Sequence, residues 1–478
     1  MTPNVLLVVL DSVRARNTSL HGHVNETTPF LETLAAEGVT YTQARAPSTW
    51  SLPSHVSMFT GLHPVEHRVT GRDVRLEPGH TVWESLRDDY GLETGVFSSN
   101  PFLTAAPVGL ESAFETSVGQ AHLPFEDAMN PREFVREHGR GAFLTYARAA
   151  VASDRPLASL INGGYEKLQR SAPWLLPSKT WGGGTDRRFA EAFLEWQENT
   201  SGPWAGCINL MGAHRPYEPV PRFDHWGGDY LRTLQSEIDS MLEFNGGARP
   251  WWQCRALTAL YDGAIRQADA VLSDLITTLR DRGVLDDTLL VVTGDHGEGF
   301  GEPSEVRPDA RAVAHGNGGS HETLLHVPLV VRYPGGDRTG TVTDVCSLTD
   351  LRELIEGAVG GDHDAFPTGG PVLASGFGLN GRMRTIASRY CEDLSPYEGE
   401  TRVLYEDSDD RHVRKHLAWK SETAAVAVRD AQVSYRIQEP NPNRVEAAFA
   451  DLDRVEVTAE AGDVDRSVQR RLEDLGYA

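Results

Sequence analysis

Lysine is nearly absent from this chain. Of its 478 residues only four are lysine, and acidic residues outnumber basic ones by 68 to 45, which gives a formal net charge of -23. Dense carboxylates keep a protein surface hydrated at high salt, so the composition predicts a salt-adapted, halophilic protein. A GC-rich genome that favours arginine codons is the alternative, and it explains the missing lysines but not the acidic excess. Such a charge argues against nucleic acid or an anionic membrane as the main partner.

Cysteine is also scarce. The four cysteines are widely spaced and show neither a disulfide framework nor metal-binding pairs: Cys207, Cys254, Cys346 and Cys391. They are predicted to be buried thiols in a reducing compartment. No apolar stretch is long enough to span a bilayer, and no targeting segment precedes the first strand. We therefore expect a cytoplasmic protein without an integral membrane segment.

Two strongly apolar runs are the clearest features that the sequence does contain. Asn4–Leu10 and Thr288–Thr293 are typical of strands in a sheet that is covered on both faces. Asp11 follows the first run, and Asp295 and His296 follow the second. Ligands of open α/β sheets bind beyond the carboxyl ends of the strands, so these side chains are expected to meet there. Two strands that deliver hard metal ligands to one edge predict a metal-dependent enzyme.

The rest of the chain alternates predicted helices and strands, as expected for a mostly parallel sheet. Strands are predicted at Val39–Ala46, Thr94–Ser98, Trp204–Met211 and Val327–Arg332, and helices at Pro29–Glu37, Leu52–Thr60 and Ala256–Arg282. Residues 110–200 have no readable pattern and are predicted to be an irregular insertion over the active face.

The chain is too long for one compact core. A stretch rich in Gly, Pro and Asp at residues 357–371 predicts a boundary between a catalytic domain at 1–356 and a small α+β subdomain at 372–478. Short alternating strands, Ala424–Val428 and Val433–Ile437, and a final amphipathic helix near Val464–Leu475 predict a small antiparallel sheet with one covering helix.

Ser51 is the candidate nucleophile. Pro53 suits the first turn of a helix, which places Ser51 beside the helix N-terminus. Free backbone N–H groups and the helix dipole favour an anion there, so a hydroxyl can be held as an alkoxide facing a phosphate or sulfate group. An ordinary N-cap is the commoner role for such a serine. The nearby Asp11 and Asp295 motifs favour the functional role.

These segments together resemble the sulfatase family of the alkaline phosphatase superfamily over roughly residues 1–350. The resemblance is carried by Asn4–Asp11 with Arg14 and His21-Gly22, Thr28–Leu31, Ser51–Gly61, Met211–Tyr217, Thr293–Glu298, His326–Leu329 and the closing Leu472–Tyr477. It implies an α/β fold, an alkaline-phosphatase-like α/β/α sandwich with a mostly parallel central sheet, plus a small C-terminal antiparallel sheet with a helix. With the acidic composition, it suggests a haloarchaeal member.

The resemblance also implies the site. Asp11, Asp295 and His296 would hold one divalent metal (Mn, Zn, Ca or Mg), with Ser51 as a further ligand and as the nucleophile. Mixed oxygen and nitrogen ligands suit Mn²⁺ or Zn²⁺ better than an all-oxygen Ca²⁺ site. His214 stands at the substrate-binding histidine of the family, where it would hold a non-bridging oxygen or protonate the leaving group.

Three positions depart from the family pattern. His55 replaces the arginine of the Cys/Ser-x-Pro-x-Arg signature, which weakens the expectation of formylglycine at Ser51. Ser12 replaces the usual second aspartate. No lysine lies near any motif, so the substrate would be held by other groups: His55, His214, His315, Arg14 or Arg16.

The predicted function is a metal-dependent, sulfatase-like hydrolase that cleaves sulfate or phosphate esters through a nucleophile derived from Ser51. A transferase that passes a phospho- or sulfo-group to a sugar or lipid acceptor is the alternative. A catalytically silent binding protein is the third possibility, and the survival of the candidate residues together argues against it. The expected partner is a small-molecule, glycan or lipid ester.

Overall fold

The structure is a computed structural model. It describes residues 2–119, 143–171 and 184–462, apart from gaps at 308–309, 317–318, 362–365, 380, 409–411 and 439–440, and a few residues elsewhere: 125, 128, 129, 131, 134, 468, 469 and 472. In these ranges, no helix is long and apolar enough to cross a membrane.

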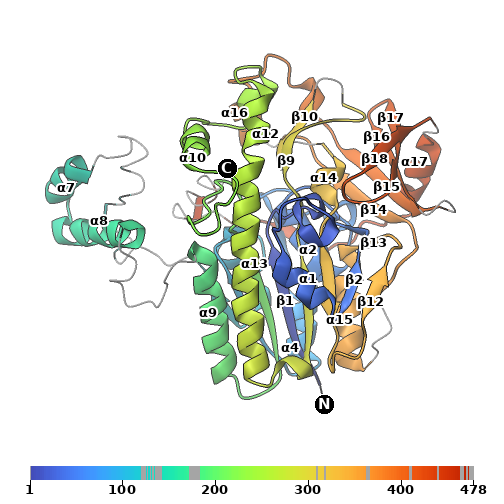
Figure 1. Ribbon diagram of the computed structural model, residues 1–478, viewed down its shortest axis with the longest axis horizontal. Helices are drawn as coiled ribbons and strands as arrows, with labels where there is room; N and C mark the ends of the chain where they lie inside the picture. Colours follow the sequence, from blue (N-terminus) through green and yellow to red (C-terminus); the bar gives the residue numbers. More distant parts are fainter. Residues whose placement is uncertain are drawn as a thin grey trace.

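An eight-stranded sheet forms the centre of the molecule (Figure 1). Its order is β12 (Gly340–Val342), β2 (Val39–Tyr41), β11 (Leu329–Arg332), β8 (Thr288–Thr293), β1 (Asn4–Leu10), β7 (Trp204–Leu210), β5 (Glu93–Ser98) and β6 (Thr116–Val118). All neighbours run parallel except β11, which is antiparallel to both β8 and β2. In β1, Val9 pairs with both Thr293 and Asn209, so the three central strands end level with one another.

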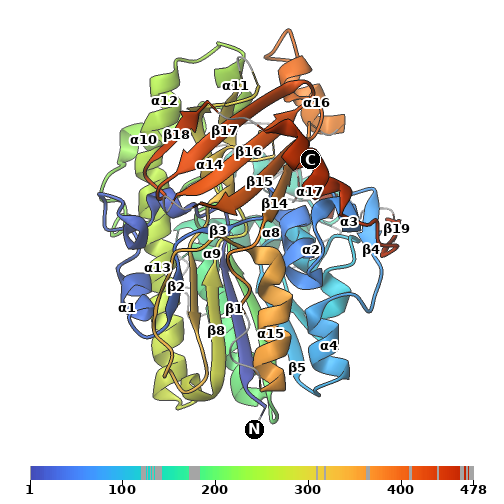
Figure 2. The ribbon, with the colours of Figure 1, turned by 90° about the vertical axis from the view of Figure 1, so that its right-hand side faces the viewer.

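Helices cover both faces of this sheet (Figures 1 and 2). Alternate residues of β1 point to opposite faces, and each set packs in a separate core. One face is covered by α1 (Pro29–Ala35), α9 (Gly184–Asn199) and α13 (Thr258–Asp281), the other by α2 (Ser51–Thr60), α4 (Val82–Asp88) and α15 (Leu351–Gly360). The result is the predicted α/β/α sandwich with a mostly parallel central sheet.

A second sheet of five antiparallel strands follows (Figure 2). Its strands are β14 (Val372–Gly376), β15 (Thr401–Asp407), β16 (Val413–Trp419), β17 (Glu422–Val428) and β18 (Ser434–Ile437). The helix α17 (Pro442–Ala450) packs Val445 and Phe449 against one face of this sheet. The other face packs on Val306, Leu325 and Val345. The predicted small antiparallel sheet with a helix is therefore present, while the division into domains at 356 and 372 stays a prediction.

Further strands and α-helices lie outside the two large sheets and their main covering helices. The strands are β3 (Ala44–Arg45), β4 (Val74–Leu76), β9 (Gly299–Pro303), β10 (Arg311–Ala314), β13 (Cys346–Ser347) and β19 (Thr458–Glu460). The helices are α3 (Pro64–His67), α5 (Pro101–Thr104), α7 (Phe143–Val151), α8 (Pro156–Ser171), α10 (Asp229–Ser236), α11 (Leu242–Asn245), α12 (Trp251–Ala256), α14 (Glu322–Leu325) and α16 (Gly381–Ala387).

Three sequence-based expectations need correction or lie outside the described residues. The insertion at 110–200 is not irregular throughout, because it contains α7, α8 and α9. The strand predicted at Val39–Ala46 is broken by a turn into β2 and β3, which belong to different sheets. The helix predicted near Val464–Leu475 falls mostly on residues that the structure does not describe.

Candidate active site

Three buried side chains meet at the carboxyl edge of the central sheet. Asp11 follows β1, and Asp295 and His296 follow the neighbouring strand β8. Each offers one ligand atom, and these atoms all lie within 4.8 Å of one another. None of the three side chains is exposed to solvent. Because both strands are fully buried and paired in register, the sheet itself holds the two carboxylates together.

The chemistry of this cluster fits a divalent cation. Oδ2 of Asp295 is buried and has no hydrogen-bond partner among the described residues, and a buried carboxylate oxygen without a hydrogen bond is costly unless a positive charge compensates it. Nδ1 of His296 lies 2.8 Å from the carbonyl oxygen of Gly297. A proton on Nδ1 donated to that carbonyl leaves Nε2 as a lone-pair ligand facing the carboxylates. Two carboxylates and one imidazole suit Mn²⁺ or Zn²⁺.

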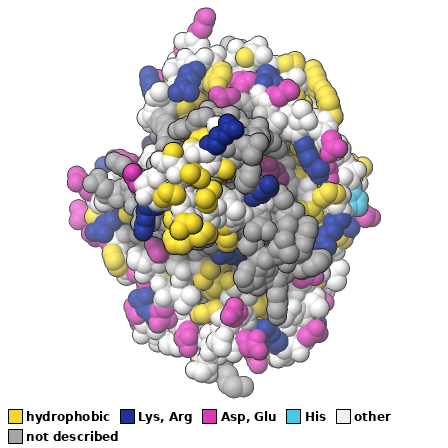
Figure 3. Space-filling view, turned by 90° about the vertical axis from the view of Figure 1, so that its left-hand side faces the viewer, with side chains coloured by type: hydrophobic (Ala, Val, Ile, Leu, Met, Phe, Trp, Pro, Cys, Tyr) yellow, Lys and Arg dark blue, Asp and Glu magenta, His cyan; other side chains and the backbone are white. Residues whose placement is uncertain are grey.

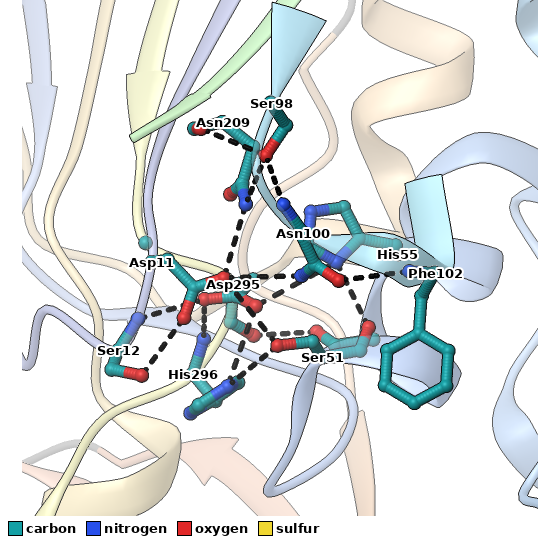
Figure 4. A network of polar contacts seen from close by, with 12 residues as sticks. Asp11, Ser12, Ser51, His55, Ser98, Asn100, Phe102, Asn209, Asp295 and His296 are labelled. Carbon is teal, nitrogen blue, oxygen red and sulfur yellow. Dashed lines mark hydrogen bonds and ion pairs between the residues drawn. The ribbon is translucent and has the colours of Figure 1, made fainter. Parts of the chain in front are cut away.

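Ser51 lies against this cluster (Figure 4). Its Oγ is 3.2 Å from Nε2 of His296 and 3.5 Å from Oδ2 of Asp11. Helix α2 begins at Ser51 itself, one residue earlier than predicted, and the capping position is taken by Trp50 without a side-chain hydrogen bond. Ser51 is therefore not an N-cap. Its hydroxyl is directed at the cluster, while the N-terminal end of α2 lies at the same point.

Ser12, which stands in place of an aspartate, connects the two carboxylates. Its backbone N–H donates to Oδ1 of Asp295 at 3.0 Å, and its hydroxyl donates to Oδ1 of Asp11 at 2.9 Å. The φ angle of Ser12 is 61°, in the left-handed region that is rare for residues other than glycine. Strain of this kind persists where surrounding contacts impose it, often at functional sites. At Ser12 this conformation accompanies the hydrogen bonds to Asp11 and Asp295.

Amide side chains complete the surroundings of Asp11 (Figure 4). Nδ2 of Asn209 and Nδ2 of Asn100 both donate to Oδ2 of Asp11, at 3.1 and 3.3 Å. Burial raises the pKa of Asp11, but the electrostatic effects of His214 and His296 and the hydrogen bond from Asn209 outweigh it, so that pKa is lowered. Sequence reasoning missed both asparagines. Asn209 lies near the end of β7 and Asn100 shortly after the end of β5, and this position on two central strands was the available signal.

A second group of titratable side chains lies beside the first. The ring of His315 is 4.5 Å from that of His296 and 4.9 Å from that of His214. Nδ1 of His315 is 3.4 Å from Oε2 of the buried Glu298. Burial lowers the pKa of His315, but the Glu298 carboxylate outweighs burial and that pKa is raised. Glu298, for which the sequence motif predicted no role, thus pairs with a predicted substrate-binding residue.

His214 differs from His315 in its protonation. Burial and the neighbouring His315 lower the pKa of His214 to about 4. Its Nδ1 lies 2.7 Å from the carbonyl oxygen of Arg215, which holds the proton on Nδ1 in the neutral ring. The two adjacent histidines therefore have pKa values displaced in opposite directions, which is the arrangement that separates an acid from a base.

Two predicted substrate-binding residues have mainly structural contacts. His55 is buried one helical turn after Ser51, with Nδ1 2.9 Å from the carbonyl oxygen of Ser51 and 3.6 Å from Oδ2 of Asp295. Arg14 pairs with Glu302 at 2.6 Å and donates to the backbone carbonyl of Glu298 at 2.8 Å. Arg14 thus anchors the Glu298–Glu302 segment. A direct contact of either residue with substrate stays a prediction.

Asp186 is a further residue that sequence reasoning missed. It lies in α9, within the insertion that had no readable pattern, and is 2% exposed. Its two carboxylate oxygens accept hydrogen bonds from the backbone N–H groups of Met211 and Gly212, both at 2.8 Å. These two residues begin the turn that carries His214. The carboxylate therefore fixes the path of the chain between β7 and that histidine.

Comparison with known proteins gives consistent matches. The sulfatase family model matches residues 3–360. Arylsulfatase K of Bos taurus is 21% identical over 375 residues, which cover 73% of this chain and 61% of that relative, so the chain spans about three fifths of its length. A phosphonate monoester hydrolase of Agrobacterium radiobacter has a similar fold, with a TM-score of 0.58, 18% identity and coverage of 88% of both chains. A protein solved in complex with its substrate D-glucosamine-2-N,6-O-disulfate is also similar, with a TM-score of 0.57, 12% identity and coverage of 89% and 91%.

Proposed function

Because the chain belongs to the sulfatase family, we propose that it is a metal-dependent hydrolase of sulfate or phosphate esters, with Ser51 as its nucleophile. The observation that carries this proposal is the position of the Ser51 hydroxyl, which lies 3.2 Å from His296 and 3.5 Å from Asp11 at the N-terminal end of α2. A hydroxyl held beside a cluster of metal ligands and a helix N-terminus is suited to attack an anionic ester.

A divalent metal is the expected cofactor, as is general in this family. Asp11, Asp295 and His296 would hold it, with the Ser51 oxygen as a fourth ligand. When bound, it would lower the pKa of the hydroxyl and offset negative charge on the ester oxygens. The protein supplies the rigid frame for this site: Asn209 and Asn100 orient Asp11, and Ser12 orients both carboxylates.

His315 and His214 support a mechanism in which one histidine donates a proton and the other accepts one. In the proposed reaction, the Ser51 hydroxyl gives its proton to solvent, Ser51 Oγ forms a bond to the sulfur or phosphorus atom, and the bond from that atom to the ester oxygen breaks. The ester oxygen leaves with a proton from His315, which solvent later restores. The Glu298 carboxylate favours the protonated form of His315 that this step needs. The neutral His214 then accepts a proton from a water molecule whose oxygen bonds to the sulfur or phosphorus atom. The bond from that atom to Ser51 Oγ breaks, and His214 returns the proton to Oγ. The pKa of His214, about 4, keeps that ring unprotonated near neutral pH.

Two features bear on whether the substrate is a sulfate ester or a phosphate ester, and they point in opposite directions. Family membership and relatives named as sulfatases favour a sulfate ester, and a sugar sulfate bound to a similar fold supports a glycan sulfate as its class. His55 in place of the signature arginine, with its contact to the Ser51 carbonyl, favours an unmodified serine and hence a phosphate ester. We propose sulfate ester hydrolysis first and phosphate ester hydrolysis second.

Two measurements test this proposal: a turnover assay tests the hydrolase activity, and mass spectrometry tests the identity of the nucleophile. Purified protein in concentrated KCl, which its acidic composition favours, would be offered nitrophenyl sulfate, nitrophenyl phosphate and bis(nitrophenyl) phosphate, each with Mn²⁺, Zn²⁺, Mg²⁺ or Ca²⁺. We expect release of nitrophenol from one class of ester, and release from none with any metal would refute the hydrolase. Mass spectrometry of the Ser51 peptide would show a loss of two hydrogens for formylglycine and an intact mass for serine.

A further inference from the structure

Two helices of the insertion project from the body of the protein. We call α7 and α8 the arm; they pack against each other and lie apart from the central sheet (Figure 1). Tyr146 of α7 is buried against α8 and, with Phe134 and Ala150, forms a small core of its own. The arm leads toward α9, whose first turn holds Asp186 at the active edge of the sheet.

The inner face of α8 is polar. Ser159 and Asn162 are both fully buried. The amide of Asn162 exchanges hydrogen bonds with the backbone N–H and carbonyl groups of Phe125, at 3.0 and 2.7 Å. The hydroxyl of Ser159 accepts from the backbone of Met129 at 3.1 Å, and its carbonyl accepts from Tyr146 at 2.6 Å. These specific contacts fix which side of α8 faces inward.

The outer face of α8 is apolar as a consequence. Leu157, Leu160 and Ile161 recur at helical spacing and are 77%, 37% and 49% exposed. Val151 of α7 is 61% exposed. A surface helix of a water-soluble domain normally turns its apolar stripe toward the core and its polar side toward solvent. In α8 this arrangement is inverted, and exposed apolar patches of this kind mark interaction sites.

The charge of the arm is opposite to that of the whole chain. Residues 143–171 contain four basic side chains, Arg148, Arg155, Lys167 and Arg170, and two acidic ones, Asp154 and Glu166, in a protein whose net charge is -23. One of the four lysines of the chain lies here. Arg148, Arg155 and Lys167 are exposed. Figure 3 shows hydrophobic side chains together with basic ones on the face of the molecule from which the arm projects.

We propose that the arm docks the protein on a membrane surface that carries anionic lipid headgroups. Aliphatic side chains flanked by basic ones are the combination that binds a helix to such an interface, with the chain lying on the membrane and not crossing it. Charge complementarity selects the lipid surface, because two copies of the arm would bring their cations together. The strongly acidic body can remain clear of the surface because the arm projects from it.

Vesicle flotation tests this proposal with the full chain. The protein would be mixed with vesicles of phosphatidylcholine alone or with 40% phosphatidylglycerol, at 0.15 M and at 2 M KCl. We expect binding to the anionic vesicles, about tenfold weaker in the double variant Leu157→Ser/Ile161→Ser because its apolar contact is lost. Arg148→Gln/Lys167→Gln should weaken binding at 0.15 M but not at 2 M, where charge is screened.

A matched control distinguishes binding through the arm from non-specific adsorption of exposed apolar side chains to vesicles. Val24 is 90% exposed and lies outside the arm, so Val24→Ser should bind vesicles as the unchanged protein does. Circular dichroism and turnover of a soluble ester would show that each variant is folded. Absence of binding, equal binding by the Leu157→Ser/Ile161→Ser variant, or a dimer in light scattering that this variant dissociates would each overturn the proposal. The last result would assign the arm to a second copy of the chain.

Discussion

The backbone N–H of Ser12 donates a 3.0 Å hydrogen bond to Oδ1 of Asp295, which is 283 residues away in the sequence. The hydroxyl of the same serine donates to Asp11. One residue with a left-handed backbone thus joins the two carboxylates that the central strands deliver to the candidate metal site. The resemblance to the sulfatase family predicts an aspartate at this position, so we infer that the candidate metal site has one hard ligand fewer.

Restoring that aspartate should strengthen cation binding. We expect Ser12→Asp to bind Mn²⁺ about tenfold more tightly in isothermal titration calorimetry, because a third carboxylate joins the two present, and aspartate tolerates a positive φ better than most residues. Without metal, the added buried charge should lower the melting temperature. Ser12→Asn, which has the size of aspartate and also tolerates a positive φ but carries no charge, is the control and should show no such gain in Mn²⁺ affinity. Unchanged affinity in Ser12→Asp would place the cation elsewhere.

Removing the nucleophile should separate catalysis from metal binding. Ser51→Ala should reduce turnover by about 10⁴-fold or more, since single losses within such catalytic groups are of that order. It should leave Mn²⁺ affinity mostly intact, because Asp11, Asp295 and His296 remain. Asp295→Asn should lose turnover and should also bind the metal at least about 100-fold more weakly. Substantial turnover by Ser51→Ala, measured with the ester identified in the screen, contradicts the assignment of the nucleophile.

Asp186 should act on catalysis through the turn that carries His214. In Asp186→Asn, one carboxylate oxygen becomes an NH₂ group that faces a backbone N–H, so one of the two hydrogen bonds to Met211 and Gly212 is lost. An unsatisfied buried donor costs about 1–3 kcal/mol. We expect kcat to fall about tenfold with a smaller change in KM. Asp274→Asn, which alters a carboxylate 61% exposed on the adjacent α13, should have no such effect.

Glu322 should make folding sensitive to acid. It pairs with Arg45 at 2.9 Å and Lys415 at 3.0 Å. Burial raises the pKa of Glu322, but these two cations outweigh it and lower that pKa to about 2. A lowered folded-state pKa stabilises the protein fully above the unfolded value, about 4.3, and this contribution is lost as the pH falls toward 2.

The variant Glu322→Gln tests whether this carboxylate is the cause of the acid sensitivity. The variant leaves Arg45 and Lys415 without their carboxylate, so its free energy of unfolding in urea at pH 7 should be lower by about 3 kcal/mol. That free energy should also vary less between pH 4.3 and 2 than in the unchanged protein. Glu198→Gln, which removes an exposed carboxylate near Arg282, should change stability by less than about 1 kcal/mol. An equal pH dependence in the unchanged protein and in Glu322→Gln would assign the acid sensitivity to other carboxylates.

The elements that sequence reasoning located best are those with strong periodicity. β1 and β8 were predicted with their observed bounds, and the long helix α13 lies within its predicted range. Fully apolar strands and a long amphipathic helix leave few alternatives because their patterns follow directly from burial. The helices α7 and α8 were missed, although Leu157, Leu160 and Ile161 recur at helical spacing in α8. Such a periodicity predicts a helix but does not say which of its faces is buried.

Sequence alone determined which residues would meet at the sheet edge. Asp11, Asp295, His296 and Ser51 follow or begin elements whose type and direction the pattern fixes, so their convergence follows from the geometry of a parallel sheet. Only the tertiary structure decided how they are held. Hydrogen bonds and ion pairs between segments distant in the chain define the roles of Asn100, Asn209, Glu298 and Asp186. Such partners cannot be predicted from the local sequence. The outward orientation of the aliphatic stripe on α8 was likewise set by the buried contacts of Ser159 and Asn162, which hydropathy cannot reveal.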